Sequence, residues 1–224
     1  MSYLECRLTY HRSRYCLALN CILVFLSAIL FEAGVAAAEG RITDQVAVTV
    51  VGRHIFAVTS GEGLIRADLS AGEEALTIDA RGLNALVLTP ERLLGFSGQL
   101  LRWSSQSIDI REHVTERLIT PQLILVRSDS RLYGFQGQVG HWRVLELDPQ
   151  EDQRQTLVGE NVAVVITGRR AIAFSALTGG FFSQDLQIGE VITDTMVNDN
   201  IVILTTSSRR LIFRSQLAIW AELR

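Results

Sequence analysis

The chain has 224 residues, of which 48% are apolar and 20% are charged, and its formal charge is −3. These values exclude a disordered chain, a collagen and a multi-span membrane protein, and they allow one domain or a small pair. All 21 basic residues are arginine, which excludes mechanisms that need lysine, such as Schiff bases and P-loop chemistry. The mild acidity argues against nucleic acid as a partner.

The first element is a predicted secretory signal peptide over residues 1–38. A basic start with Arg7, Arg12 and Arg14 precedes the apolar run 16–31, and small residues end at Ala38, where we expect cleavage. An uncleaved anchor is the alternative, but the run is shorter than the roughly 20 residues of a spanning helix. Both interpretations place residues 39–224 outside the cytoplasm as a periplasmic or secreted domain, and only the anchor would contact the membrane.

Removing this segment also removes every thiol in the chain. The three cysteines, Cys6, Cys16 and Cys21, all lie within it. The mature chain therefore has no disulfide and no thiolate ligand for a metal. Its stability has to come from burial alone, which 186 residues can provide.

From residue 39 onward the sequence repeats with a period of 39 residues. One series is basic: Arg53, Arg92, Arg131, Arg170 and Arg209. A second contains every tryptophan: Leu64, Trp103, Trp142, Phe181 and Trp220. Two more series have the same period, one of them Ala57, Phe96, Phe135, Phe174 and Phe213, and the other Glu73, Glu112, Glu151 and Glu190. A fixed period of this length is typical of repeat architectures.

Each repeat predicts four short strands. In the third unit the apolar run 123–126 and the segment 131–135 are separated by a Ser-Asp-Ser turn, and alternating residues 141–147 follow a glycine turn. A polar turn then precedes a more polar strand at 154–158. Such runs, rich in β-branched and aromatic residues, are typical of strands. Four antiparallel strands in about 40 residues match a β-propeller blade.

The number of repeats predicts an all-β, five-bladed β-propeller in a single domain, residues 39–224. Four units that start at Gln45 end at Asn200, and the last 24 residues suffice for three strands. We expect residues 39–44 to add the fourth strand to that last blade and so to close the ring without exposed edges. An open β-solenoid is the alternative, although its repeats are usually shorter or contain helices.

The segments 128–135 and 140–142, read as Ser-Asp-Ser-Arg-Leu-Tyr-Gly-Phe and Gly-His-Trp, resemble the repeat of quinoprotein-like β-propellers. The resemblance covers the whole mature chain weakly and the third blade best, and it supports the fold only. It implies no cofactor, because no residues here match a cofactor site. Five-bladed lectins of the tachylectin type provide a second, architectural comparison.

The two ends of the blades carry different side chains. One end gathers amides before the first strand and in the second loop of the repeat: Gln45, Asn84, Gln122, Asn161, Asn200, Gln99, Gln138 and Gln216. Uncharged donors and acceptors suit a hydroxyl-rich or peptide-like ligand, and the alternative is that they bond the turn backbone. The other end carries the Arg and Glu series, which we interpret as structural pairs, and the alternative is a cationic ring for an acidic ligand or partner. The aromatic series Trp103, Trp142, Phe181 and Trp220 is expected to pack between blades.

Signs of an enzyme are missing from the sequence, so we predict no catalytic residues, no metal and no cofactor. The mature histidines stand alone, and the only candidates for a glycosidase pair are Asp44, Glu160 and Asp199 at the strand mouths. The leading hypothesis is a non-catalytic binding or scaffold module for a protein partner. A multivalent carbohydrate-binding propeller that uses the amide end is the alternative, and a glycoside hydrolase is the third hypothesis.

Overall fold

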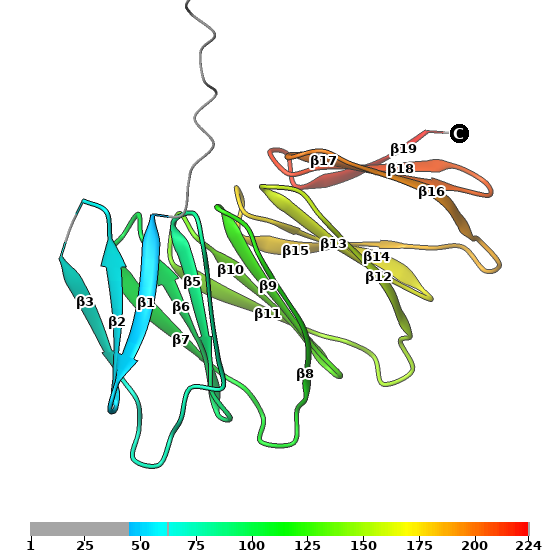
Figure 1. Ribbon diagram of the computed structural model, residues 1–224. Coiled ribbons are helices and arrows are strands. Elements are labelled where there is room, and N and C mark those ends of the chain that lie inside the picture. The colour runs from blue at the N-terminus through cyan, green and yellow to red at the C-terminus, as the bar shows by residue number, and fades with distance from the viewer. Residues whose placement is uncertain (1–44, 62, 224) are drawn as a thin grey trace, which may run out of the picture. The chain divides into compact units, whose positions relative to one another are not determined.

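The structure is a computed structural model that describes residues 45–61 and 63–223. In this part of the chain the regular structure is entirely β, with 19 strands in five antiparallel sheets (Figure 1). The prediction of an all-β chain with five propeller-type blades is confirmed. No helix of the described residues is long and apolar enough to cross a membrane. The predicted signal peptide and its cleavage site lie outside the described residues.

The strands of each sheet follow the chain order as a meander. The first sheet contains β1 (Val46–Val51), β2 (His54–Thr59) and β3 (Leu64–Asp68). The second contains β4 (Thr77–Arg81), β5 (Asn84–Leu88), β6 (Arg92–Ser97) and β7 (Arg102–Ser107). The third contains β8 (Val114–Ile119), β9 (Leu123–Ser128), β10 (Arg131–Gln136) and β11 (His141–Glu146).

The last two sheets repeat this arrangement. The fourth contains β12 (Gln153–Val158), β13 (Val162–Thr167), β14 (Arg170–Ser175) and β15 (Gly180–Asp185). The fifth contains β16 (Ile192–Val197), β17 (Ile201–Thr206), β18 (Arg210–Arg214) and β19 (Ile219–Leu223). Four of the five sheets therefore have four strands, and the first has three among the described residues.

The polar strand of each repeat belongs to the next sheet, which corrects the predicted blade boundaries. The strand predicted at 154–158 pairs with β13, not with β11. The reason is the length of the connections. Residues 159–161 link β12 to β13 as a tight hairpin, whereas the longer segment 147–152 crosses from β11 to the next sheet. Short connections favour antiparallel neighbours.

The prediction that the last blade lacks a fourth strand of its own is wrong for the same reason. The fifth sheet already has four strands from residues 192–223, and residues 39–44 lie outside the described residues. Each cluster of buried side chains in the described chain joins one sheet to the next in sequence, and none joins the fifth sheet to the first. Figure 1 shows these two sheets at opposite ends of the row of sheets. The described residues therefore do not close a ring.

The sheets are held together by apolar side chains that alternate between their two faces. The third sheet places Tyr133, Phe135 and Trp142 against the second, whereas Leu123 and Leu132 face the fourth. Because both faces are covered, β13 is buried at every position, as near-continuous apolar strands predict. In the terminal sheets the strands alternate instead: β17 alternates between partly buried and buried residues, and most of β1 alternates between exposed and partly buried ones.

The aromatic series lies at these junctions. Cross-strand aromatic pairs recur with ring centroids 5.0 Å apart for Phe135 and Trp142, and the same pairing appears in sheets two, four and five. The Trp142 indole N–H donates to the Ser104 carbonyl of the preceding sheet at 3.1 Å. Gly95 makes room for the ring, because a Cβ there would lie 2.8 Å from Phe135 Cε2. Each aromatic pair thus fills the space between two sheets.

Candidate functional site

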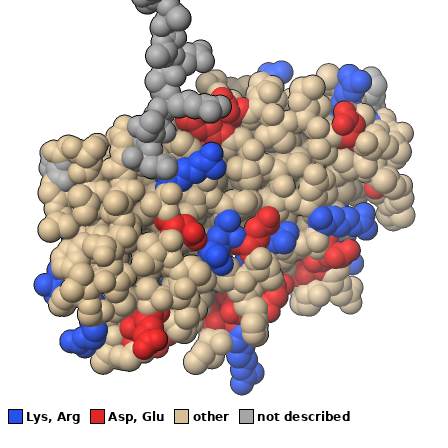
Figure 2. Space-filling view, in the orientation of Figure 1, with Lys and Arg blue, Asp and Glu red and all other residues tan. Residues whose placement is uncertain are grey.

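The meander gives the row of sheets two ends with different chemistry. The end formed by the β5–β6, β9–β10, β13–β14 and β17–β18 hairpin turns, together with the loops between sheets, we call the loop end. The opposite end, formed by the turns that follow β4, β6 and their equivalents, we call the amide end. Figure 2 shows basic and acidic side chains side by side in the lower half of the view, where the loops between sheets lie in Figure 1.

A four-residue turn lies in each loop between sheets, and its last residue is always glutamate. In the turn 187–190 the Glu190 N–H donates to the Gln187 carbonyl at 2.9 Å, and the Glu190 carboxylate accepts from the Gln187 N–H at 2.6 Å. The same two bonds close the turns 70–73, 109–112 and 148–151. The glutamate series therefore holds both ends of each turn.

Each glutamate is also bound by a hydroxyl and by an arginine from the following sheet, and we call this group a triad. In the fifth sheet the Thr206 hydroxyl donates to Glu190 at 2.6 Å and the Arg209 Nε–H donates at 2.9 Å. The equivalent triads are Glu73–Thr89–Arg92, Glu112–Ser128–Arg131 and Glu151–Thr167–Arg170. The hydroxyl also accepts from the arginine N–H, 3.0 Å for Arg209, so the triad fixes the hairpin turn as well.

The triad carboxylates are buried, and in three of them the bonded partners hold the pKa below its usual value. The four glutamate side chains are at most 2% exposed. The Arg92 and Arg209 guanidinium groups lower the pKa of Glu73 and Glu190 to about 2, against the opposing effect of burial. Burial acts to raise the pKa of Glu151, yet bonds from Arg170 and Thr167 keep it below its usual value. The carboxylates in turn raise the pKa of Arg92, Arg170 and Arg209.

In sheets two to five, each arginine of the series is therefore bound to the glutamate of its triad. Arg92, Arg170 and Arg209 also donate to backbone carbonyls of the preceding sheet, at 2.8 Å from Arg209 to Asp185. Arg53 differs, because the β1–β2 connection is a tighter turn around Gly52, where φ is 61°, and Arg53 is exposed there. The loop end therefore does not present a ring of free cations.

The tips of the inter-sheet turns are apolar and face solvent. The second residue of each turn is exposed. In chain order these residues are Ala71, Ile110, Pro149 and Ile188. Ile110 is 86% exposed, and Ile188 is fully exposed. Isoleucine is among the residues most often buried in proteins. Two such side chains on turns held by buried triads are an unusual feature of this surface.

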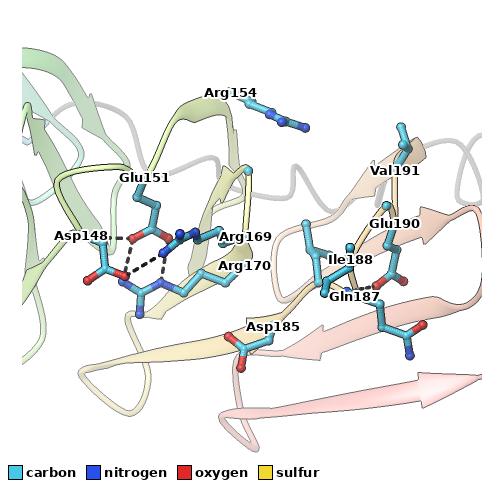
Figure 3. Close-up of a pocket in the computed structure, with 13 residues that line it drawn as sticks. Asp148, Glu151, Arg154, Arg169, Arg170, Asp185, Gln187, Ile188, Glu190 and Val191 are labelled. Atoms are coloured by element: carbon cyan, nitrogen blue, oxygen red, sulfur yellow. Dashed lines mark hydrogen bonds and ion pairs between the residues drawn. The ribbon is translucent and has the colours of Figure 1, made fainter.

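A groove of about 700 Å³ opens between the last two sheets beside the Ile188 tip. Figure 3 shows Asp148, Glu151, Arg169 and Arg170 on one side and the segment from Asp185 to Val191 on the other. The exposed charges are loosely paired, with Arg169 3.7 Å from Asp148 and Arg154 3.9 Å from Asp152. Such surface pairs contribute little to stability, so they can exchange partners at low cost. The groove thus combines apolar surface with adaptable charges.

At the amide end the structure brings together only pairs of the predicted residues. The Asn161 amide donates to Asn200 at 2.9 Å, and the Gln138 amide lies 3.5 Å from the Gln122 oxygen. Asn84 is buried and donates to the Thr120 carbonyl of the next sheet at 3.1 Å. The side chains of Gln45, Gln99 and Gln216 are exposed. Glycan binding by this end stays a prediction.

The carboxylates proposed for a hydrolase stay equally untested. Glu160 and Asp199 lie at turns of the amide end, where their carbonyls accept bonds from neighbouring turns, and Asp44 lies outside the described residues. Within residues 45–61 and 63–223 there is no group of three or more His, Cys, Asp or Glu side chains that could hold a metal.

Sequence reasoning missed the hydroxyl member of the triads. Thr89, Ser128, Thr167 and Thr206 follow each other at the same 39-residue period, and each stands three residues before its arginine. The period was therefore a sufficient signal. It was overlooked because threonine at the end of a strand is also explained by β-propensity.

A comparison with protein families and one with curated proteins found no match. Among solved structures, the chain is similar to HIRA residues 644–1017, with a TM-score of 0.38 and 9% identity over 80% of this chain and 53% of that one. Hsv2 from Kluyveromyces lactis has a TM-score of 0.37 and 9% identity, over 82% and 61% of the two chains. The N-terminal domain of Nup159 has a TM-score of 0.34 and 10% identity, over 76% of this chain and 55% of that one. This chain thus spans 53% to 61% of their lengths, and at these TM-scores the likeness indicates nothing about its ligand.

Proposed function

We propose that this chain is an extracytoplasmic, non-catalytic binding module whose loop end holds a protein partner. The observation that carries the proposal is Ile188, fully exposed at the tip of a turn that the buried Glu190–Thr206–Arg209 triad holds in place. Full burial of an isoleucine is worth about 1.5–3 kcal/mol. A turn that is already rigid loses little conformational entropy when a partner binds.

The groove beside this tip supports a protein rather than a small ligand. Its walls carry both signs of charge together with Leu186, Ile188 and Val191. Protein interfaces combine an apolar centre with a polar rim. The partner is therefore expected to bring a hydrophobic pocket for Ile188 and polar groups for Arg154 and Arg169.

Cross-linking in the producing cell tests this proposal. A photo-reactive residue at position 188 is expected to form adducts with a discrete partner, and the Arg154→Ala variant is expected to reduce their yield. Leu217 is the matched control, because it is 63% exposed in a turn of the amide end. Equal labelling from positions 188 and 217, or no adduct from position 188, would contradict the proposal.

Location outside the cytoplasm belongs to the same proposal and rests on the sequence of residues 1–38. Fractionation with N-terminal sequencing tests it, and the mature protein is expected to begin at Glu39. A cytoplasmic chain that retains Met1 would contradict it.

Membership of the quinoprotein-like group of propellers is also proposed, on the segments 128–135 and 140–142, and it adds no cofactor.

A further inference from the structure

Every junction between sheets uses the same two faces. The face toward the preceding sheet, which we call the front face, carries the aromatic pair, as with Phe135 and Trp142 in the third sheet. The face toward the following sheet, the back face, carries small and aliphatic residues, as with Leu123 and Leu125. Front packs against back at each of the four junctions in the described chain.

Among residues 45–61 and 63–223, no sheet covers the back face of the fifth sheet. Ile201, Ile203 and Ile212 stand one period after Val162, Val164 and Ala173, which are completely buried by the fifth sheet. All three isoleucines are only partly buried. Around them, Met196 is 55% exposed, and Ile219 and Leu223 are each 54% exposed.

The first sheet has the complementary front face, and no other sheet of the described part of the chain covers it. Val58 and Leu64 are cross-strand partners and occupy the place of the Phe96–Trp103 pair in the second sheet. They are 39% and 66% exposed, and Phe56 lies beside them on the same face. The same face also carries the His54–Asp68–Arg66 cluster at its edge, and the back face of the fifth sheet carries the exposed Arg210 and Arg214 beside its isoleucines.

We propose that the back face of the fifth sheet binds the front face of the first sheet of a second copy of this chain. The contact would continue the junction that the chain already makes four times. The smaller Val58–Leu64 pair stands in for an aromatic pair, and it would face isoleucines that replace the smaller Val162, Val164 and Ala173. The two faces of one chain lie at opposite ends of the row of sheets (Figure 1), so the matching face comes from another copy. Such a head-to-tail contact leaves one free face at each end, which gives closed rings or filaments.

Light scattering after size exclusion tests this proposal on the protein as the cell processes it from the full-length chain. The mass is expected to rise above that of the monomer between about 1 and about 100 μM, a range typical of modest interfaces. Ile203→Arg buries a charge in the interface and should raise the midpoint concentration at least roughly tenfold. Leu64→Arg should do the same from the other face, whereas Ile188→Arg is the control at the loop end and should have no effect.

A mixture of the two variants sharpens the result. Ile203→Arg keeps an intact front face and Leu64→Arg keeps an intact back face, so together they should form a dimer and nothing larger. A wild-type monomer at every concentration, as closure within one chain would produce, overturns the proposal, and so do oligomers that persist in both variants. If Ile203→Arg does not fold by circular dichroism, Met196→Arg at the edge of the same face replaces it. Loss of a partner at position 188 would leave these masses unchanged, so the two proposals fail separately.

Discussion

The loop end and the amide end of the same blades are joined by different interactions. At the loop end each junction depends on a buried carboxylate, with Glu190 bound by Thr206 and Arg209. At the amide end the links are neutral, such as the Asn161–Asn200 bond and the Ser175 hydroxyl that donates to the Ser215 carbonyl at 2.8 Å. Buried charges hold geometry strongly but depend on pH, whereas neutral bonds contribute less and are insensitive to it.

The largest effect is expected from removing one charge of a triad. Arg209→Ala leaves Glu190 buried without its counter-ion, which should lower the free energy of unfolding by about 3–5 kcal/mol. Denaturation by urea measures this. Arg111→Ala, in the exposed turn of the third sheet's loop, is the control and should stay within about 0.5 kcal/mol of wild type. Equal effects of the two variants would contradict the structural role of the triads.

A comparable loss is expected near the amide end when the apolar filling between sheets is removed. Trp142 is 9% exposed and packs with Phe135 between the second and third sheets, so Trp142→Ala should cost about 3–5 kcal/mol. Trp142→Phe keeps most of the packing and loses the indole bond to Ser104, which should cost about 1 kcal/mol. Unchanged thermal stability of Trp142→Ala would place this ring outside the core.

Acid should weaken the loop end before the amide end. The pKa values of Glu73 and Glu190 lie near 2 in the folded chain, below their unfolded values near 4.5, so their contribution is complete above about pH 5. It is lost progressively as the pH falls from about 4.5 to 2. Hydrogen exchange, corrected for the intrinsic effect of pH, should show lost protection in segments 70–73 and 187–190 first. Simultaneous loss in the amide-end turns would contradict the contrast.

The smallest effect is expected from the neutral links. Asn161→Ala removes the bond to Asn200 and should cost about 1 kcal/mol. Gln216→Ala, exposed at the same end, should cost nothing measurable. A loss for Asn161→Ala as large as that of Arg209→Ala would remove the distinction between the ends.

The 39-residue period was enough to predict the strands, the number of sheets and the shared end of the Arg and Glu series. It could not assign the polar strand to a sheet, because the same strand is adjacent in sequence to two possible partners. Only the shorter connection, 159–161 against 147–152, distinguishes them. The period also could not predict how far apart the first and last sheets lie, for a different reason. The angle between successive sheets is set by packing contacts such as Phe135 on Gly95, and no local pattern records it.

The exposed tips were also missed, because the repeat predicts a polar turn at this place and gives no reason to expect an exposed isoleucine at position 188. Its exposure follows from the turn that Gln187 and Glu190 close, with Gly189 at φ 79°. In the same way Arg53 looked equivalent to the triad arginines, although the β1–β2 turn excludes it from that role. Periodic position therefore predicts an environment only where the backbone also repeats.

Two double-mutant cycles, Glu190 with Arg209 and Asn161 with Asn200, test the contrast between the ends most directly. Each cycle uses alanine variants, with unfolding by urea at pH 7 and at pH 3. We predict a coupling energy of about 1.5–3 kcal/mol for the charged pair that shrinks at pH 3, and less than about 1 kcal/mol for the amide pair at both values. Equal couplings, or a charged-pair coupling that acid leaves unchanged, would contradict this account.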